Sequence, residues 1–382
     1  MPFYVSQGEI PPKRHTAFKK DDGGIYYEEL VSREGFSSIY SNYYHLHRPT
    51  KIKQVGNLNK IELQHASTQH RPRHIFTHNI QNVGDILSGR IPLFFNDDIT
   101  ISAIAVTNSM DYFYRNGIGD EILYIQSGSG KLLSNLGNIE CQAGDYIIIP
   151  RGIIWQIVQD EVLKILVIDS VGPVETPSQY RNRFGQLMEH APFCERDIKI
   201  PKLQQPVDKT GDFLIKTKTS HGIQEYYYAH HPFDIIGWDG FYFPWSLNIN
   251  DFEPIVGSIH QPPPVHQTLQ APGFVVCSFV PRLFDFHPDS IPAPYPHSNV
   301  DSDEIIYYSK GDFMSRDGIQ AESITHHPMG LPHGPQPGKY KSSIGKERTD
   351  ELAVMIDTFK PLKITQAARE IDDSDYPLSW MD

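Results

Sequence analysis

Three side chains in the C-terminal part of the chain have the types and the spacing of a metal site. His297 and Glu304 lie seven residues apart, and the run PMGLPH ends at His333. Two imidazoles and one carboxylate can hold a divalent ion while leaving coordination positions open for other ligands. We therefore predict a mononuclear Fe(II) centre of the two-histidine, one-carboxylate type, carried on short strand-like segments around a turn at Gly311.

The residues near these candidates bear on the number of ligands and on which carboxylate binds. Asn299 stands two positions after His297, where a second histidine would add a ligand. Three protein ligands would leave three positions free on a six-coordinate ion, whereas a structural site is usually closed. Asp301 and Asp303 are rival carboxylates. We favour Glu304, because its distance in sequence to the following glycine recurs elsewhere in the chain.

The pattern occurs twice. In both halves of the chain a glutamate is followed by six residues and a glycine: Glu121 and Gly128, then Glu304 and Gly311. Downstream, PRGIIW at 150–155 corresponds to PMGLPH at 328–333. These segments resemble the two halves of the cupin signature, and the resemblance implies two small β-barrels in one chain, a bicupin.

The first copy lacks the histidines. Asn116 stands near the first ligand position, and Trp155 stands where the second copy has His333. Indole donates a hydrogen bond and is not a metal ligand. We therefore expect the first barrel to be metal-free and structural, and the second to carry the site. The second copy also departs from the family motif at Glu322, where a glycine is usual six residues before the proline.

The elements expected to position these residues are strands. β-Branched runs separated by Gly, Asn and Asp at about 8–12 residue spacing are typical of antiparallel sandwiches and barrels. Two short helices are predicted, over Gln179–His190 and over ITQAAREI (364–371). The prediction is an all-β dominated fold with an N-terminal arm and few short helices. The strand-like runs are 99–107, 121–128, 144–152, 162–170, 274–281, 304–311 and 351–359.

The expected organisation has three parts. Residues 1–90 are polar and form an N-terminal arm and packing segment. Residues 91–240 hold the degenerate, metal-free cupin barrel with an irregular extension. Residues 241–382 hold the metal-binding catalytic cupin barrel and the C-terminal tail.

The composition excludes several classes of partner. The chain has 382 residues and a net charge of -12, with 21% charged and 39% hydrophobic residues. An acidic chain without a basic stripe argues against nucleic acid as a partner. No signal peptide and no apolar run of about 18 residues is evident. The widely spaced Cys141, Cys194 and Cys277 indicate reduced thiols. We expect a cytoplasmic protein with neither membrane nor nucleic-acid partners.

Longer stretches around the site resemble the homogentisate 1,2-dioxygenase family. They read GSIHQPPPVHQT, VPRLFDFHPDSIPAPYPHSNVDSDE, HHPMGLPHGPQPGKY and DELAVMIDTFKPL, and the opening GEIPPKRHTAF with YYEEL resembles the shorter bacterial form. The resemblance implies an Fe(II)-dependent dioxygenase that converts homogentisate and O₂ to maleylacetoacetate in tyrosine and phenylalanine catabolism. It also implies a homo-oligomer, a trimer or a hexamer.

The resemblance assigns roles to two further histidines. His260 matches the family's acid–base histidine, and a free imidazole titrates in the range needed to accept a phenol proton. His266, six residues later, could be confused with it. His327 lies six residues before His333 and matches a second family histidine near the substrate.

Phe313 is the clearest departure from the family pattern. The family often has a tyrosine in contact with substrate two residues after the glycine, and this chain has no hydroxyl there. Either Tyr307, Tyr308 or Tyr340 supplies the hydroxyl, or the substrate contact differs. We count His327, Tyr307, Phe313 and Tyr340 as candidate substrate-binding residues.

Two other functions stay open. The first keeps the iron and changes the substrate to another hydroquinone or a gentisate-like acid. The second is a non-enzymatic bicupin that binds or stores a ligand. Such a protein need not retain three metal ligands together with His260 and His327, so the sequence favours an enzyme that acts on a small aromatic acid and O₂.

Overall fold

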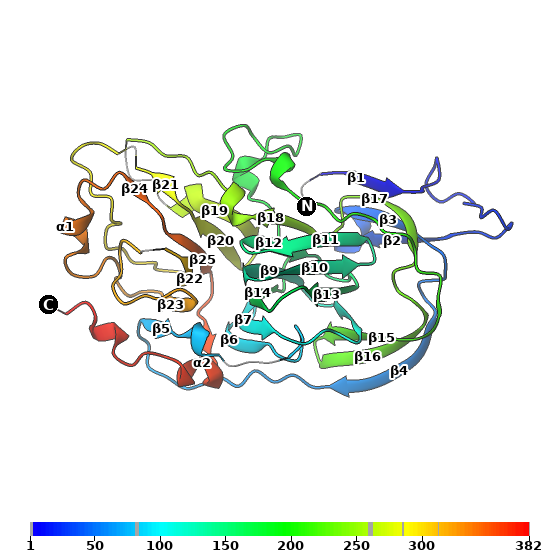
Figure 1. Ribbon diagram of the computed structural model, residues 1–382, viewed down its shortest axis with the longest axis horizontal. Helices are drawn as coiled ribbons and strands as arrows, with labels where there is room; N and C mark the ends of the chain where they lie inside the picture. Colours follow the sequence, from blue (N-terminus) through cyan, green and yellow to red (C-terminus); the bar gives the residue numbers. More distant parts are fainter. Residues whose placement is uncertain (1–2, 81–83, 259–262, 285, 312, 382) are drawn as a thin grey trace.

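The computed structural model describes residues 3–80, 84–258, 263–284, 286–311 and 313–381, and β-sheets form most of this part of the chain (Figure 1). The α-helices of the described residues are short, α1 (Lys339–Ser343) and α2 (Gln366–Glu370). The prediction of an all-β dominated fold with few short helices is confirmed. The helix predicted over residues 179–190 is wrong, because this stretch holds a 3₁₀ turn at Ser178–Tyr180 and then a hairpin-like loop.

Two sheets repeat one strand order. The first-half sheet contains the order β12-β9-β14-β7-β6, and the second-half sheet contains β23-β22-β25-β20-β19. The repeated glutamates occupy matching places, since Glu121 pairs with Asp169 across β9 and β14, and Glu304 pairs with Asp357 across β22 and β25. The ten strands are β6 (Ile91–Phe95), β7 (Ile99–Val106), β9 (Asp120–Ser127), β12 (Asp145–Ile149), β14 (Leu163–Ser170), β19 (Gln267–Ala271), β20 (Phe274–Phe279), β22 (Asp303–Lys310), β23 (Ser323–His327) and β25 (Leu352–Thr358).

Each of these sheets is extended by a strand from a distant part of the chain. β5 (Arg73–Ile75), from the N-terminal segment, pairs with β23 in the second-half sheet. β26 (Lys363–Ile364), near the C-terminus, pairs with β6 in the first-half sheet, and β18 (Trp245–Asn248) pairs with β12. The expected boundaries at residues 90 and 240 stay a prediction, and the strand pairing crosses both of them.

Three further sheets complete the framework. A four-stranded sheet joins the N-terminal arm to β17, and a seven-stranded sheet contains the long β15–β16 hairpin, which has no counterpart among the predicted strands. Their strands are β1 (Val5–Gly8), β2 (Tyr27–Ser32), β3 (Tyr40–His45) and β17 (Ile235–Gly240), then β4 (Ile52–Asn59), β8 (Phe113–Asn116), β10 (Ser129–Ser134), β11 (Gly137–Gln142), β13 (Trp155–Gln159), β15 (Thr210–Thr219) and β16 (Gly222–His230), then β21 (Arg282–Leu283) and β24 (Arg348–Thr349).

The two repeated sheets lie side by side and share one apolar core (Figure 1). Buried hydroxyl groups link them, because Tyr124 donates to Ser309 at 2.8 Å and the Tyr146 and Ser278 hydroxyls lie 2.9 Å apart. A hydrogen bond between buried groups contributes about 1 kcal/mol, and leaving one partner unpaired costs more. The metal-site half is therefore held firmly against the other half.

The backbone conformation at the end of each repeated strand requires a glycine. Gly128 has φ +89° and Gly311 has φ +109°, a region that side chains with a Cβ rarely adopt. A Cβ on Gly128 would lie 2.3 Å from the Val162 carbonyl oxygen, and one on Gly311 would lie 2.5 Å from that of Asp350. The same steric restriction thus explains the same residue in both halves.

Glu322 takes the backbone conformation that a glycine would hold more easily. Its φ is +59°, in the left-handed region. Its carboxylate receives the Lys164 ammonium group at 2.7 Å, an ion pair between the two halves. The departure from the family motif therefore places an acidic side chain where it reaches the first half of the chain.

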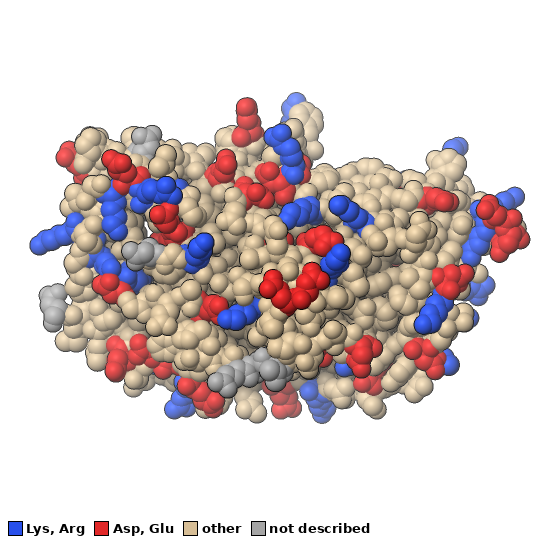
Figure 2. Space-filling model, in the orientation of Figure 1, with Lys and Arg blue, Asp and Glu red and all other residues tan. Residues whose placement is uncertain are grey.

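Charged side chains of both signs are interspersed on the face shown in Figure 2. Among the described residues, no helix is long and apolar enough to span a membrane. The described cysteines form no disulfide, and Cys141 and Cys277 are buried.

Candidate metal centre

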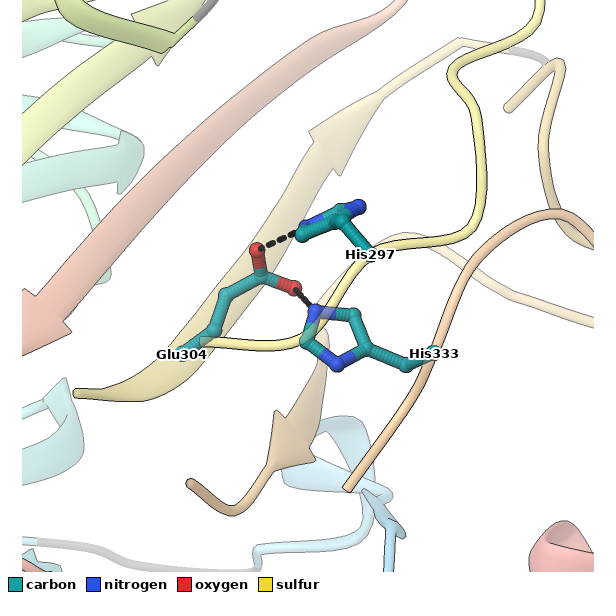
Figure 3. Close-up of side chains that lie close together, drawn as sticks. All are labelled: His297, Glu304 and His333. Carbon is teal, nitrogen blue, oxygen red and sulfur yellow. Dashed lines mark ion pairs between the residues drawn. The ribbon is translucent and has the colours of Figure 1, made fainter. Parts of the chain in front are cut away.

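The structure brings His297, Glu304 and His333 together at one end of β22 (Figure 3). Glu304 is the second residue of this strand. His297 and His333 lie opposite each other on two loop segments, and each backbone N–H donates to the other's carbonyl at 2.8 Å. This backbone pairing holds the two imidazoles beside the carboxylate.

The hydrogen bonds of the two rings point their Nε2 atoms at the glutamate. Nδ1 of His297 lies 3.1 Å from the Tyr295 carbonyl, and Nδ1 of His333 lies 3.1 Å from the Leu331 carbonyl. A carbonyl only accepts, so each Nδ1 carries the proton and each Nε2 has its lone pair free. One ligand atom from each of the three residues lies within 4.8 Å of the others.

These donors fit a divalent ion. The Nε2 atoms lie 3.9 Å and 3.6 Å from the Glu304 carboxylate oxygens, beyond hydrogen-bond distance. The Nε2 of His333 is buried and has no hydrogen-bond partner among the described residues. A buried acceptor without a donor is costly, and a metal ion placed between the three groups would satisfy it.

His327 supports the glutamate from the adjacent strand. Its Nδ1 lies 2.7 Å from Glu304 Oε1, and its ring stacks on His333 at 4.6 Å between centroids. Burial lowers the pKa of His327 to about 3, so the ring is neutral and its Nδ1–H donates to the carboxylate. Its Nε2 then accepts, and the Tyr376 hydroxyl lies 3.3 Å away.

The electrostatics of the site favour an ionised glutamate. Burial raises the pKa of Glu304, but interactions with the three surrounding histidines outweigh burial and hold that pKa well below its usual range. The pKa of His297 is raised, mainly because its side chain interacts with Glu304. Across β25, burial and the charge of Glu304 raise the pKa of Asp357 to about 8.

Strand alternation separates the rival carboxylates. Asp303 points away from the site and accepts hydrogen bonds from the Met329 N–H at 2.7 Å and the Leu362 N–H at 2.8 Å, with His326 Nε2 at 3.1 Å. Asp301 is exposed. The geometry therefore favours Glu304, and Asp303 fixes the loops that frame the site.

A cavity of about 310 Å³ opens beside the candidate ligands. His297 and Glu304 lie in its wall. The remainder is largely apolar, with two arginines and two further acidic groups. The wall residues that matter below are Arg282, Ile306, Tyr308, Phe313, Arg316, Glu351, Met355 and Asp357.

Some of the predicted substrate-binding residues line this cavity and others do not. Phe313 lines the cavity, as does Tyr308, whose hydroxyl lies 3.0 Å from Thr325 Oγ1. Tyr307 and Tyr340 are not part of this cavity wall, and their assignment as substrate-binding residues stays a prediction. Tyr307 faces the opposite side of β22, against Tyr124 of the first half, and Tyr340 lies on the surface helix α1.

The predicted catalytic histidine, His260, lies outside the described residues. Pro263 and His266, shortly after it in sequence, line the cavity. Three groups near the site were not predicted from the sequence: Asp357, Arg316 and Tyr376. Only Asp357 had a local signal, because it is an acidic residue in the otherwise apolar run LAVMIDTF.

In the first half, positive side chains pair with the two carboxylates that correspond to Glu304 and Asp357. Glu121 receives the Arg90 guanidinium at 2.7 Å, and Asp169 receives the Lys218 ammonium group at 2.8 Å. Trp155, at the position of His333, is fully buried with its ring edge-on to that of Tyr114. Both halves thus keep a glutamate and an aspartate opposite each other on adjacent strands, but the side chains around the pair differ.

Comparison with known proteins agrees with this geometry. The family model described as "Homogentisate 1,2-dioxygenase N-terminal" matches residues 31–249, more than half of the chain. A Saccharolobus solfataricus protein, named as a dioxygenase without a stated substrate, is 42% identical over 100% of this chain and 99% of its own length. The chain belongs to the homogentisate 1,2-dioxygenase family.

Members of the homogentisate 1,2-dioxygenase family with a named substrate are more distant. The Sinorhizobium medicae homogentisate 1,2-dioxygenase is 24% identical over 100% of this chain and 90% of its own length. The Rhizobium meliloti enzyme is 26% identical over 71% of this chain and 62% of its own length. A solved cupin barrel protein from Leptotrichia buccalis covers 80% of this chain and 100% of its own, at 12% identity and a TM-score of 0.37.

Proposed function

We propose that the protein is an Fe(II)-dependent dioxygenase that opens the ring of homogentisate to give maleylacetoacetate. The observation that supports this most is the buried, unpartnered Nε2 of His333 beside His297 and Glu304, two residues that line a cavity of about 310 Å³. Two histidines and one carboxylate are the ligand set of Fe(II) oxygenases that keep positions open for substrate and O₂. Because the chain belongs to a dioxygenase family, we infer that this ligand set binds iron for a reaction with O₂.

The chain's own groups have defined tasks in this reaction. His297, Glu304 and His333 would hold the iron, which when bound supplies a site where the phenol oxygen of the substrate and O₂ meet. His327 fixes the Glu304 carboxylate through its Nδ1–H. The apolar wall at Phe313 excludes water from the aromatic ring.

The reaction needs no added reductant. Homogentisate is an electron-rich hydroquinone, so the ring itself is oxidised as both atoms of O₂ enter the product. The phenol must lose a proton to bind as phenolate, and its ordinary pKa is about 10. His260 stays our proposed acceptor of that proton.

A gentisate-like acid or another hydroquinone is the second candidate substrate. Phe313 favours this alternative, because it lines the cavity where the family often has a tyrosine. Tyr308 is the nearest source of a replacement hydroxyl, with its ring 4.4 Å from that of Phe313. Its hydroxyl is already close to Thr325, so its contact with substrate would differ from that of the family tyrosine.

Oxygen uptake tests the proposal. The protein is purified anaerobically, loaded with Fe(II), mixed with homogentisate and exposed to air, while the enol absorbance of the product is followed. We expect about one O₂ consumed per homogentisate, and no uptake by the His333→Ala variant. Uptake with gentisate or methylhydroquinone but none with homogentisate would show that the proposed substrate is wrong and that the enzyme acts on the other compound. No uptake with any of them would favour a binding or storage protein.

A further inference from the structure

The cavity wall contains a buried guanidinium group without a carboxylate partner. Arg316 is 6% exposed and lines the same cavity as Glu304. No carboxylate among the described residues lies within ion-pair distance of it. By contrast, the buried Arg73 lies close enough to Asp372 for an ion pair. A buried charge is normally compensated by a partner, so the wall has an unmatched positive group.

Neighbouring groups hold Arg316 in place. Its Nη1 donates to the Gly334 carbonyl at 2.5 Å, and its guanidinium lies over the Trp380 ring, 5.4 Å from the centroid. Trp380 is itself fixed by a hydrogen bond from its indole N–H to Gly334 at 3.0 Å. The Nε of Arg316 is buried and has no hydrogen-bond partner in the described part of the chain. These contacts hold the guanidinium group rigidly at the cavity wall, where a carboxylate would complete its hydrogen bonding.

The charge balance of the wall points to an anion. Burial lowers the pKa of Arg316, but the neighbouring Tyr376, Tyr308 and Glu304 outweigh burial and raise it, and Glu304 is the carboxylate among them. Once Glu304 binds a divalent ion, its negative charge is shared with that ion, and Arg316 needs another counter-charge. The second arginine of the wall is different, because Arg282 lies 3.8 Å from Glu351. An incoming anion would compete with Glu351 there but has no competitor at Arg316.

Arg316 and the metal ligand Glu304 are close enough for one small aromatic acid to reach both. His327 contacts both groups, since its Nε2 lies 3.5 Å from Arg316 Nη2 and its Nδ1 lies 2.7 Å from Glu304 Oε1. Phe313 and Ile306 contribute apolar surface to the same cavity. A flat ring with a hydroxyl at one side and a carboxylate on a short arm would span the two.

We propose that Arg316 binds the carboxylate of the substrate and sets the specificity of the site for aromatic acids over neutral phenols. The inference rests on the proposed function for the identity of the site. It assigns the anion-binding group, which the ligand set alone does not. It also explains how an acidic chain with a net charge of -12 can bind an anionic substrate.

Anaerobic binding tests this without turnover. The probes are 4-hydroxyphenylacetate and its neutral amide, titrated into the Fe(II)-loaded protein and followed by calorimetry and by tryptophan fluorescence. Because Trp380 stacks on Arg316, we expect the acid to change the fluorescence. We expect Arg316→Gln to weaken acid binding by about 10- to 100-fold and to change amide binding by less than about threefold.

Three variants make the result specific. Arg316→Lys keeps the charge but not the fork of N–H donors, and we expect an intermediate loss of acid binding. Arg348→Gln, at an exposed position, controls for a general change of charge. Arg282→Gln tests the rival arginine, and loss of acid preference there alone would overturn the assignment. Iron content and melting temperature confirm that each variant is folded and loaded.

The outcomes separate this inference from the proposed substrate. If the acid binds through Arg316 but homogentisate is not cleaved, the anion site stands and the proposed substrate is wrong. If wild-type protein binds acid and amide equally, or Arg316→Gln weakens both equally, the inference is overturned. If Arg316→Gln does not fold, the wild-type comparison and Arg316→Lys still decide it.

Discussion

At the scale of single residues, the two halves differ in what neutralises a buried glutamate. Glu121 has the Arg90 guanidinium, whereas Glu304 has two histidines, His297 and His333, that with it can hold a cation from solution. Both solutions avoid an isolated buried carboxylate, which would be costly. The first half thus retains the acidic position while a side chain of the protein supplies the positive charge.

Replacing this side chain should affect stability and leave iron binding unchanged. Arg90→Met would leave Glu121 and Asp169 buried with only Lys218 nearby, and breaking such a pair costs about 3–5 kcal/mol. Urea unfolding of the metal-free protein measures the loss. A loss below about 1 kcal/mol, or a fall in iron per chain, would contradict this role for Arg90.

His45 should make stability depend on pH. Burial lowers its pKa, but hydrogen bonds with Asp234 at 2.8 Å and Glu29 at 3.0 Å outweigh burial and raise it to about 9. The unfolded value is about 6.5, so this stabilisation is complete below pH 6.5 and is lost as pH rises through 9, on the order of 3 kcal/mol. In urea unfolding of the wild type, we expect the free energy of unfolding to fall between pH 6.5 and 9, and we expect this fall to be absent in His45→Gln. The same pH profile in wild type and variant would contradict this role for His45.

The internal repeat and the resemblance to the cupin signature were enough to predict that His297, Glu304 and His333 lie together, because they mark the strand and turn that carry them. They could not predict Arg316, which follows Phe313 in a loop and reaches the site only through tertiary packing. Strand alternation, by contrast, is sufficient to separate the two adjacent tyrosines. Tyr308 lies four residues after Glu304 and shares its face of β22, whereas Tyr307 lies on the opposite face against the first half.

At the scale of elements, the glycines after β9 and β22 hold the repeated strands close to their neighbours. Gly311→Ala should cost several kcal/mol, since the added Cβ would clash with the Asp350 carbonyl in a backbone region unfavourable to alanine. We expect Gly128→Ala to behave alike, because its Cβ would lie 2.3 Å from the Val162 carbonyl. Thermal unfolding checks both.

Two other glycines provide matched controls. Gly152 and Gly330 have φ +87° and +79°, but a Cβ on either would meet nothing within 4 Å. We expect their alanine variants to cost only about 1 kcal/mol, the conformational strain without the clash. If Gly311→Ala costs no more than Gly330→Ala, the close approach of the neighbouring strand is not what demands glycine.

The strands of the repeat were predictable, whereas the predicted helix at 179–190 was wrong for a local reason. The Asn182 side chain accepts from the N–H groups of Phe184 and Gln186, and Gly185 adopts φ +85°. These features close a hairpin-like turn in place of a helix. The β15–β16 hairpin was missed because many of its residues are half-buried and polar, which weakens the alternation of apolar residues.

At the scale of the whole molecule, each half completes the other. β5 belongs to the second-half sheet, and β26 belongs to the first-half sheet (Figure 1). We therefore expect a single cooperative unfolding transition in calorimetry. Residues 241–382 expressed alone should not fold, because they lack β5 and the contacts with Tyr124 and Tyr146. Two separate transitions, or a folded fragment that binds iron, would contradict this. The expected trimer or hexamer stays a prediction that sedimentation can test.

The central claim is one metal centre per chain, built from His297, Glu304 and His333 in the second half. Iron bound after anaerobic loading and gel filtration tests it most directly. We predict about one Fe(II) per wild-type chain, almost none for His333→Ala, and about one for the control His326→Ala, whose ring faces Asp303 on the other side of the strand. Full iron retention by folded His333→Ala, or two ions per wild-type chain, would contradict the account.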